Sequence, residues 1–252
     1  MAFTPTKDQL IPDLSPREEI VLLARALWKG GYRDNLAGHI TYNNGDGTLL
    51  CNPWYLTWEE FNPEDVLLID LEGNLLEGDW PVPLGIPLHL ALHKARPNVT
   101  YALHNHSEYG TVWADIKEIP PMHDQSSSLG GGGDLVLVEE YDGGVDQADA
   151  AESAIEAFGD AEVALLGGHG VFVTGNSAPA VYLRAASLEL RCKNAWMVRV
   201  ANGPEKTSLP DWWVDQMTRS DGSGYTGFWE SAVRAALRDE PELLGKIASV
   251  SR

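Results

Sequence analysis

Two histidines at the end of an apolar segment are the first residues here whose type and spacing could do chemistry. Residues 99–106 read Val-Thr-Tyr-Ala-Leu-His-Asn-His, which is rich in strand formers until its last three residues. Side chains in a strand alternate between faces, so His104 and His106 point to the same side, about 7 Å apart along the strand. Each histidine alone could be an ordinary core or surface residue. The pair on one face needs a partner, and it forms one edge of a metal site.

A third histidine lies in a second apolar segment, residues 163–174. Gly167, Gly168 and Gly170 surround His169, and glycine inside a strand marks a bulge, a tight bend or the close approach of another group. The alternative is a plain β-hairpin whose turn happens to contain His169. With the pair upstream, we favour a third ligand. Three imidazoles with open positions for water or substrate suit a catalytic divalent ion such as zinc, manganese or iron(II).

Another histidine pair lies one helical turn apart, in a segment predicted to be a helix from Pro87 to Ala95. Residues i and i+4 share a helix face, so His89 and His93 could bind a metal in principle. The glutamate that would strengthen such a motif beside the first histidine is absent from the sequence. We therefore expect His93 to be a surface or packing residue, and His89 to lie behind the metal ligands.

The composition excludes several classes of protein. At 252 residues and 44% apolar, the chain can bury a core and is not disordered as a whole. Its net charge of −19 argues against nucleic acid and against anionic membranes as partners. No segment reaches the roughly 18 apolar residues that span a bilayer, and the N-terminus has no signal region. Cys51 and Cys192 do not indicate a disulfide framework. We expect a cytoplasmic protein.

Helix and strand patterns alternate along most of the chain. A capping box with proline at the first helical position, Ser15 to Glu18, begins a helix that Gly30 and Gly31 end. The segment Asn43 to Gly47 is a hairpin turn. We predict strands and helices in the order helix 15–28, strand 39–41, strand 48–51, strand 66–70, helix 87–95, strand 99–106, helix 107–115, strand 135–138, helix 145–158, strand 163–174 with a turn at 169, and helix 177–200.

This order predicts a three-layer α/β/α domain with a central sheet. The hairpin turn and the turn at His169 imply antiparallel neighbours, so we expect the sheet to be mixed or mainly antiparallel. We expect one domain over residues 1–252, with a core at 15–200 and an aromatic-rich, partly helical extension at 201–252. The glycines at 130–133 lack the pattern of a nucleotide-binding loop.

Several short motifs occur in an order that resembles the class II aldolase/adducin superfamily, from about Glu18 to Val200. The motifs are Gly38-His39-Ile40-Thr41, Asn52-Pro53-Trp54, Leu67 to Gly73, His89 before Arg96-Pro97-Asn98-Val99, His104-Asn105-His106 and Leu165 to Gly170. The resemblance implies an α/β/α fold around a mostly antiparallel sheet and a divalent metal held by His104, His106 and His169. It also implies a cyclic homotetramer with active sites at subunit boundaries.

The chain departs from the sugar-phosphate aldolases that it resembles. Those enzymes place a catalytic glutamate four residues before the histidine that corresponds to His89, and Gly85 occupies that position here. Glu108 could substitute for it, although strand alternation favours a side chain in solvent. A base tyrosine that some members carry corresponds to Gln125. The residues that bind phosphate in those enzymes are poorly kept, and aromatic and apolar residues such as Trp54 occur instead.

These losses favour a non-phosphorylated small molecule, either a hydroxy acid or an aromatic carboxylic acid. We expect Asn35, Trp54, Gly85 and Gln125 to bind it. Decarboxylation needs no base to start; it needs an electron sink and later a proton donor. A metal-dependent carbon–carbon lyase, and a decarboxylase rather than an aldolase, is therefore our first interpretation.

The expected proton donor is a histidine, because imidazole titrates near neutral pH. The candidates are His39, His89 and His123, the last of which lies in the loop before the four glycines. Two alternatives stay open. The same three-histidine site would serve a non-haem iron(II) oxygenase, and a non-catalytic scaffold like adducin would need no metal.

Overall fold

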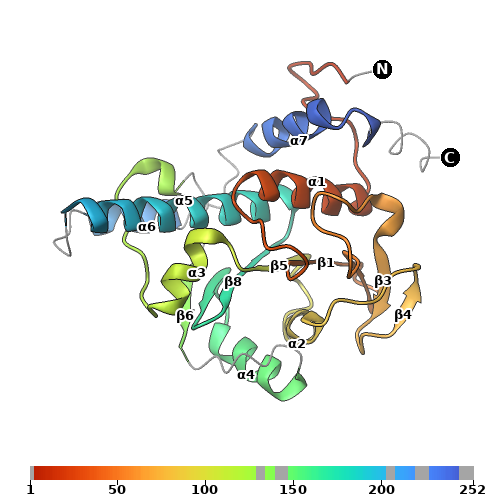
Figure 1. The fold of residues 1–252 in the computed structure, drawn as a ribbon, viewed down its shortest axis with the longest axis horizontal. Helices are drawn as coiled ribbons and strands as arrows, with labels where there is room; N and C mark the ends of the chain where they lie inside the picture. Colours follow the sequence, from red (N-terminus) through yellow and green to blue (C-terminus); the bar gives the residue numbers. More distant parts are fainter. Residues whose placement is uncertain (1–2, 129–133, 140–146, 203–207, 219–226, 244–252) are drawn as a thin grey trace.

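A mixed eight-stranded sheet forms the centre of the computed structural model, which describes residues 3–128, 134–139, 147–202, 208–218 and 227–243. The strand order is β4-β3-β2-β1-β5-β8-β7-β6 (Figure 1). All neighbouring pairs in it are antiparallel except β6 and β7, which are parallel. The predicted, mainly antiparallel sheet is thus confirmed. The strands are β1 His39–Asn43, β2 Thr48–Cys51, β3 Leu67–Asp70, β4 Leu75–Glu77, β5 Tyr101–Asn105, β6 Leu135–Val138, β7 Val163–Leu166 and β8 Gly170–Gly175.

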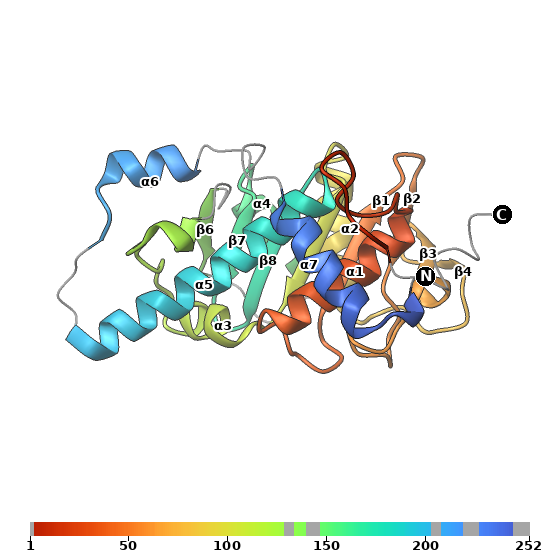
Figure 2. The ribbon, with the colours of Figure 1, turned by 90° about the horizontal axis from the view of Figure 1, so that it is seen from above.

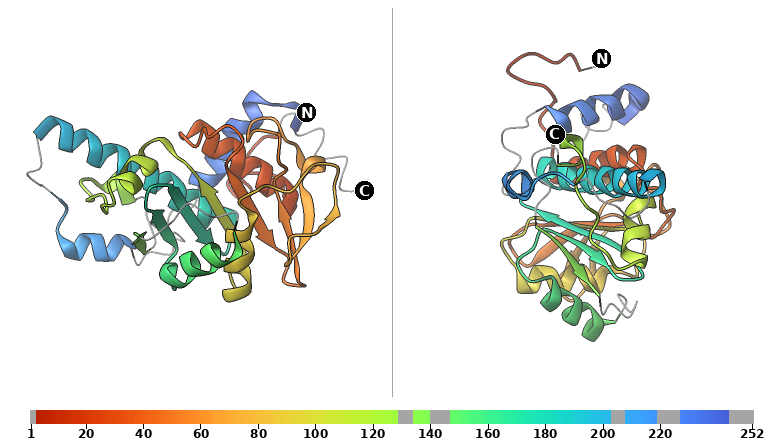
Figure 3. Two further views of the ribbon diagram at one scale, coloured as in Figure 1. Left: turned by 60° about the horizontal axis from the view of Figure 1, so that its bottom comes forward. Right: turned by 90° about the vertical axis from the view of Figure 1, so that its left-hand side faces the viewer.

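Helices cover both faces of the sheet and give the three predicted layers. One face carries α1 (Pro16–Lys29) and α5 (Ala178–Asn202), and the opposite face carries α2 (Ile86–Ala95) and α4 (Ala148–Phe158) (Figure 3). The helix α7 (Phe228–Asp239) packs on α1 and α5, on their side away from the sheet. The remaining helices are α3 Glu108–Asp115, α6 Asp211–Thr218 and the short 3-10 helices η1 Pro63–Asp65 and η2 Gln125–Ser128. Figure 2 shows α1, α5 and α7 running across the strands.

Strand alternation divides the core into two sides. Leu103 on β5 packs in the cluster that contains α1, α5 and α7. Its neighbour Ala102 and the β8 residue Phe172 pack with α2 and α4 instead. His104 follows Leu103 and so faces the α2 side, as does His39, its partner across β1 and β5. The sheet therefore presents its histidines to α2.

The sequence signals for helix ends and turns are found where they were predicted. Both halves of the Ser15 capping box are present, with the Ser15 amide donating to Glu18. The segment predicted as one interrupted strand, 163–174, is the antiparallel pair β7 and β8 with His169 in the turn. The short edge strand β4 was not predicted, because its residues are all exposed and show no apolar alternation.

Parts of the predicted extension pack on the core. Trp229, Val233 and Ala236 of α7 are buried in the same cluster as α1. The four glycines at 130–133, and Tyr225 in the aromatic stretch, lie outside the described residues. Among the helices that are described, none combines the length and apolarity needed to cross a membrane.

Candidate metal centre

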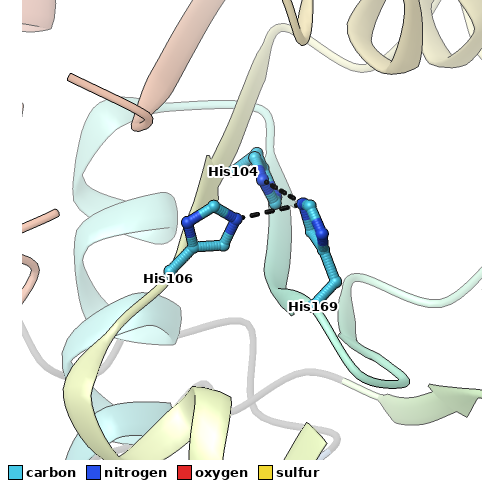
Figure 4. A group of neighbouring side chains, drawn as sticks. All are labelled: His104, His106 and His169. Atoms are coloured by element: carbon cyan, nitrogen blue, oxygen red, sulfur yellow. Dashed lines mark hydrogen bonds between the residues drawn. The ribbon is translucent and has the colours of Figure 1, made fainter. Parts of the chain in front are cut away.

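Three imidazoles converge at the end of β5 and the β7–β8 turn (Figure 4). His104 is the fourth residue of β5, His106 follows its end, and His169 lies in the turn before β8. The Nε2 atom of His169 lies 3.0 Å from Nε2 of His106 and 3.2 Å from Nε2 of His104. The three ligand atoms all lie within 4.8 Å of one another. The structure thus brings together the three histidines that the sequence predicted as one site.

Two of the rings are held by their other nitrogen. His104 Nδ1 lies 3.0 Å from the carbonyl oxygen of Val171 on β8. His106 Nδ1 lies 3.0 Å from Oδ2 of Asp34, which also accepts a hydrogen bond of 2.9 Å from the His106 amide. A ring that donates through Nδ1 keeps the lone pair of Nε2 free, which is how metal-binding histidines are usually oriented. Both Nε2 atoms are therefore ready to bind a cation.

Asp34 contacts the site through His106, and sequence reasoning missed it. It is partly buried in the turn before β1, next to the predicted substrate residue Asn35. The signal was a carboxylate in a polar turn, which is common in loops. Only the packing of this turn against the end of β5 distinguishes Asp34 from other acidic turn residues.

The glycines around His169 have separate roles. Gly168 has a positive φ of 71° and open space around it, so it permits the turn. A Cβ at Gly170 would lie 2.6 Å from the carbonyl oxygen of Asn105 and 2.6 Å from Cδ2 of His106. Gly170 therefore allows β8 to approach the end of β5, which brings His169 to the other two rings. Of the three possibilities that the glycines left open, a tight bend is found at Gly168 and a close approach at Gly170.

The donor set fits a divalent cation. Two nitrogens bound to one metal at about 2.1 Å, at angles of 90–110°, lie about 3.0–3.4 Å apart. The distances from His169 Nε2 to the other two rings, 3.0 Å and 3.2 Å, lie in this range. Burial, followed by the neighbouring histidines, holds the pKa of His104 well below its usual value and lowers that of His169 to about 4. The neutral imidazole is the form that binds metals. His104, His106 and His169 would hold such an ion.

His39 stands beside the three histidines, in the space that a side chain at residue 85 would fill. Its ring centroid lies 5.6 Å from that of His104. A Cβ at Gly85 would lie 2.7 Å from His39 Nδ1. The backbone of Gly85, at φ −81° and ψ 9°, is one that any residue adopts. The position therefore needs glycine because a side chain would clash with the His39 ring, and not because of its backbone conformation.

His89 and His93 are buried between α2 and the sheet. Their rings share one partner: Thr41 Oγ1 lies 2.9 Å from His89 Nδ1 and 2.9 Å from His93 Nε2. Of the two roles predicted for His93, packing is the one observed, since its side chain is buried. The ring of His89 lies edge-on to that of His39, with centroids 5.9 Å apart. His89 thus lies behind His39, and no metal is needed to explain its pairing with His93.

The other predicted site residues are spread more widely. Asn35 is exposed and has a positive φ of 47°. Trp54 is partly buried beside Tyr55. His123 precedes η2 and Gln125 begins it, in a segment that packs on α5. Their roles in substrate binding or proton transfer stay predictions.

Glu108, the predicted substitute for a glutamate at position 85, is exposed at the start of α3. It lines a groove with Lys29 of α1, Arg33 in the segment that follows α1, and Lys193 of α5. This surface lies on the α5 side of the sheet, whereas His39 and Gly85 lie on the α2 side. Solvent exposure is the outcome that strand alternation favoured.

Residues 18–196 match the class II aldolase and adducin N-terminal domain. The chain belongs to this family. Its relatives include a 3,4-dihydroxyphthalate decarboxylase from Arthrobacter keyseri, 32% identical over 211 residues, which covers 77% of this chain and 83% of the relative. They also include a 5-deoxy-D-ribulose 1-phosphate aldolase from Bacillus thuringiensis, 27% identical over 176 residues, with 69% and 80% covered.

Solved structures of the family share the fold. An L-fuculose 1-phosphate aldolase from Glaciozyma antarctica superposes with a TM-score of 0.77 at 20% identity, and the match covers 92% of this chain and 96% of the aldolase. The family relationship expected from the sequence motifs is confirmed. Decarboxylases and aldolases both occur among the relatives, so family membership alone does not separate these two reactions.

Proposed function

We propose that this protein is a divalent-metal-dependent carbon–carbon lyase that decarboxylates a non-phosphorylated hydroxy acid or aromatic carboxylic acid. The observation that carries the proposal is the convergence of His104, His106 and His169, whose Nε2 atoms lie 3.0 Å and 3.2 Å apart in the two close pairs. When bound there, a zinc, manganese or iron(II) ion would polarise a substrate oxygen and stabilise the negative charge that develops as the bond breaks.

The residues around the three histidines support decarboxylation over aldol cleavage. An aldolase needs a base that removes a proton from carbon, and Gly85 offers no side chain for this task. His39 fills that space instead, with both ring nitrogens buried and without a hydrogen-bond partner among the described residues. A decarboxylase needs only a proton donor after carbon dioxide has left. The 32% identical relative is named as a decarboxylase, which also supports this choice.

Residues around the proposed metal site orient the histidine rings and exclude water from its inner wall. Asp34 and the carbonyl of Val171 fix the rings of His106 and His104. His39, His89 and His104 are nine-tenths or more buried, so the inner wall of the site is closed to bulk solvent. A dry site strengthens electrostatic interactions with the substrate. We further propose that the protein assembles as a homotetramer.

The first experiment measures metal and reaction together. Protein purified without chelator or metal-affinity resin is analysed by mass spectrometry, alongside His104→Ala. We expect about one divalent ion per chain in the wild type and a large loss in the variant. The purified protein is then assayed for carbon dioxide release from 3,4-dihydroxyphthalate and related dihydroxybenzoates.

Each possible result of this experiment has a distinct meaning. Carbon dioxide release that depends on the metal supports the proposal. Cleavage of a hydroxyketone phosphate without decarboxylation would favour an aldolase, and oxygen uptake with iron alone would favour an oxygenase. Absence of metal from both proteins would contradict the catalytic proposal and leave a scaffold.

A further inference from the structure

A row of buried polar groups leads away from the metal centre between the sheet and α2. The Oγ1 atom of Thr41, on β1, contacts two histidines of α2. It lies 2.9 Å from Nδ1 of His89 and 2.9 Å from Nε2 of His93. The exposed fraction is 0% for Thr41, 0% for His89 and 1% for His93. Polar groups buried this deeply are costly unless they are paired, so their arrangement calls for an explanation.

The hydroxyl of Thr41 links the two rings, because it has one hydrogen. In the described part of the chain, Thr41 Oγ1 has these two imidazoles as its hydrogen-bond partners. It can donate to one ring and accept from the other. If it donates to His89, both histidines carry their hydrogen on Nε2. If it donates to His93, both carry it on Nδ1. The two rings therefore hold the same tautomer and change it together.

We propose that His89, Thr41 and His93 form a proton relay that supplies the metal centre from the outer end of α2. The use of that proton rests on the proposed decarboxylation, in which each turnover replaces one carboxyl group by one hydrogen. The relay itself rests on the two hydrogen bonds to Thr41. None of its three members is a metal ligand, and each passes a hydrogen without becoming charged.

Burial explains why a relay is needed in place of one acidic histidine. Desolvation holds the pKa of His89 well below its usual value and lowers that of His93 to about 4, so both rings are neutral near pH 7. A neutral imidazole that gives up its only hydrogen would become an anion. When a hydrogen arrives at the other ring nitrogen in the same event, the ring stays neutral.

The transfer balances as follows. The carbon–carbon bond breaks, its electron pair stays on the substrate carbon, and carbon dioxide leaves. One hydrogen moves out from His89 Nε2, the Thr41 hydrogen moves to His89 Nδ1, and the His93 Nε2 hydrogen moves to Thr41. His93 Nδ1 takes a replacement proton from water. The sum is one carboxylate and one proton converted into one C–H bond and carbon dioxide. Both rings end with their hydrogen on Nδ1, so rotation of the rings and of the Thr41 hydroxyl must restore the first tautomer before the next turnover.

The two ends of the relay are His89, on the side of the metal centre, and His93, near the end of α2. At the inner end, His89 Nε2 is buried without a hydrogen-bond partner among the described residues, and the ring of His39 lies between it and His104. Unpartnered buried nitrogens need a ligand or a water molecule. At the outer end, His93 is followed by the exposed residues Lys94 and Ala95 at the end of α2. His93 Nδ1 is itself buried without a hydrogen-bond partner among the described residues, so the relay requires a water molecule to reach it from this end of α2. At the inner end, the hydrogen that leaves His89 Nε2 must pass the ring of His39 to reach the metal centre.

Nuclear magnetic resonance tests the relay directly. Protein labelled with ¹⁵N-histidine is examined by long-range ¹H–¹⁵N correlation at pH 7.5, and the signals are assigned with His89→Gln and His93→Gln. We expect both rings to be neutral and to show the same tautomer in the wild type. Opposite tautomers, or a positively charged ring at either position, would overturn the proposal. The measurement needs no substrate, and the two folded variants serve only to assign the signals.

A matched pair of variants links the relay to catalysis. Thr41→Val removes the hydroxyl and keeps the shape, whereas Thr41→Ser keeps the hydroxyl. We expect Thr41→Val to lower kcat about 10-fold to 100-fold with little change in KM and to uncouple the tautomers, and Thr41→Ser to restore both. A kcat unchanged in a folded Thr41→Val protein would also overturn the relay. If the wild type decarboxylates no tested acid, the proposed function fails. The tautomers of His89 and His93 still decide whether the two rings are coupled through Thr41.

Discussion

At the scale of single residues, the pair His39 and Gly85 gives a sharp test of how the site is built. Gly85→Ala adds a Cβ that would lie 2.7 Å from His39 Nδ1 in an otherwise ordinary backbone conformation. We expect it to destabilise the fold by about 1–3 kcal/mol, as overpacking does. In a His39→Ala background the same change should cost close to nothing. Urea unfolding of all four proteins measures this coupling. If Gly85→Ala lowered the free energy of unfolding equally with and without His39→Ala, the His39 ring would not be the reason for glycine at position 85.

Asp34 gives a second prediction at this scale. It orients His106 through two contacts, so Asp34→Asn weakens the hydrogen bond to the ring and keeps the side-chain shape. We expect the affinity for zinc to fall about 10-fold to 100-fold, which is typical when the partner of a metal-binding histidine is lost. Titration against a competing chelator measures the affinity. Asp13→Asn, at an exposed carboxylate, is the control and should bind as the wild type does.

At the scale of elements, the β7–β8 turn decides whether the third ligand reaches the site. Gly170→Ala would force β8 away from the carbonyl of Asn105 and the ring of His106. We expect loss of metal and a lower melting temperature. Gly168→Asn is the control, because asparagine tolerates a positive φ and the space there is open. Metal content and thermal unfolding are measured together. Metal retention in a folded Gly170→Ala protein would contradict this account of the turn.

The same elements show what could be predicted from the sequence. Residue type, strand alternation and the glycines were enough to group His104, His106 and His169, because each signal is local. Thr41 and Asp34 carry no local signal of their roles. Thr41 meets His93 only because β1 lies under α2, and Asp34 meets His106 only through packing of the turn before β1. Contacts between distant segments are set by tertiary packing, which one sequence does not reveal.

The whole molecule places neutral histidines inside its core and is therefore expected to be sensitive to acid. The pKa of His93 is lowered by burial to about 4, against about 6.5 in an unfolded chain. Between these values the unfolded chain binds a proton that the folded protein does not, so the free energy of unfolding falls as pH falls. The full stability is present above pH 6.5, and for His93 the loss reaches about 3 kcal/mol near pH 4. His89, whose pKa is also lowered, acts in the same direction.

The measurement is urea unfolding of metal-free protein at pH 7, 6 and 5, compared with His93→Gln. Glutamine keeps a polar group beside Thr41 but does not titrate, so the variant should lose stability less steeply as pH falls. Glu19 and Glu189, whose pKa values are raised by burial, act in the opposite direction in both proteins and cancel in the comparison. Added zinc should hold the wild type folded to lower pH, because the metal competes with protons for the three ligands. The same pH dependence with and without His93 would mean that burial does not lower the pKa of this ring, which would contradict this account of acid sensitivity.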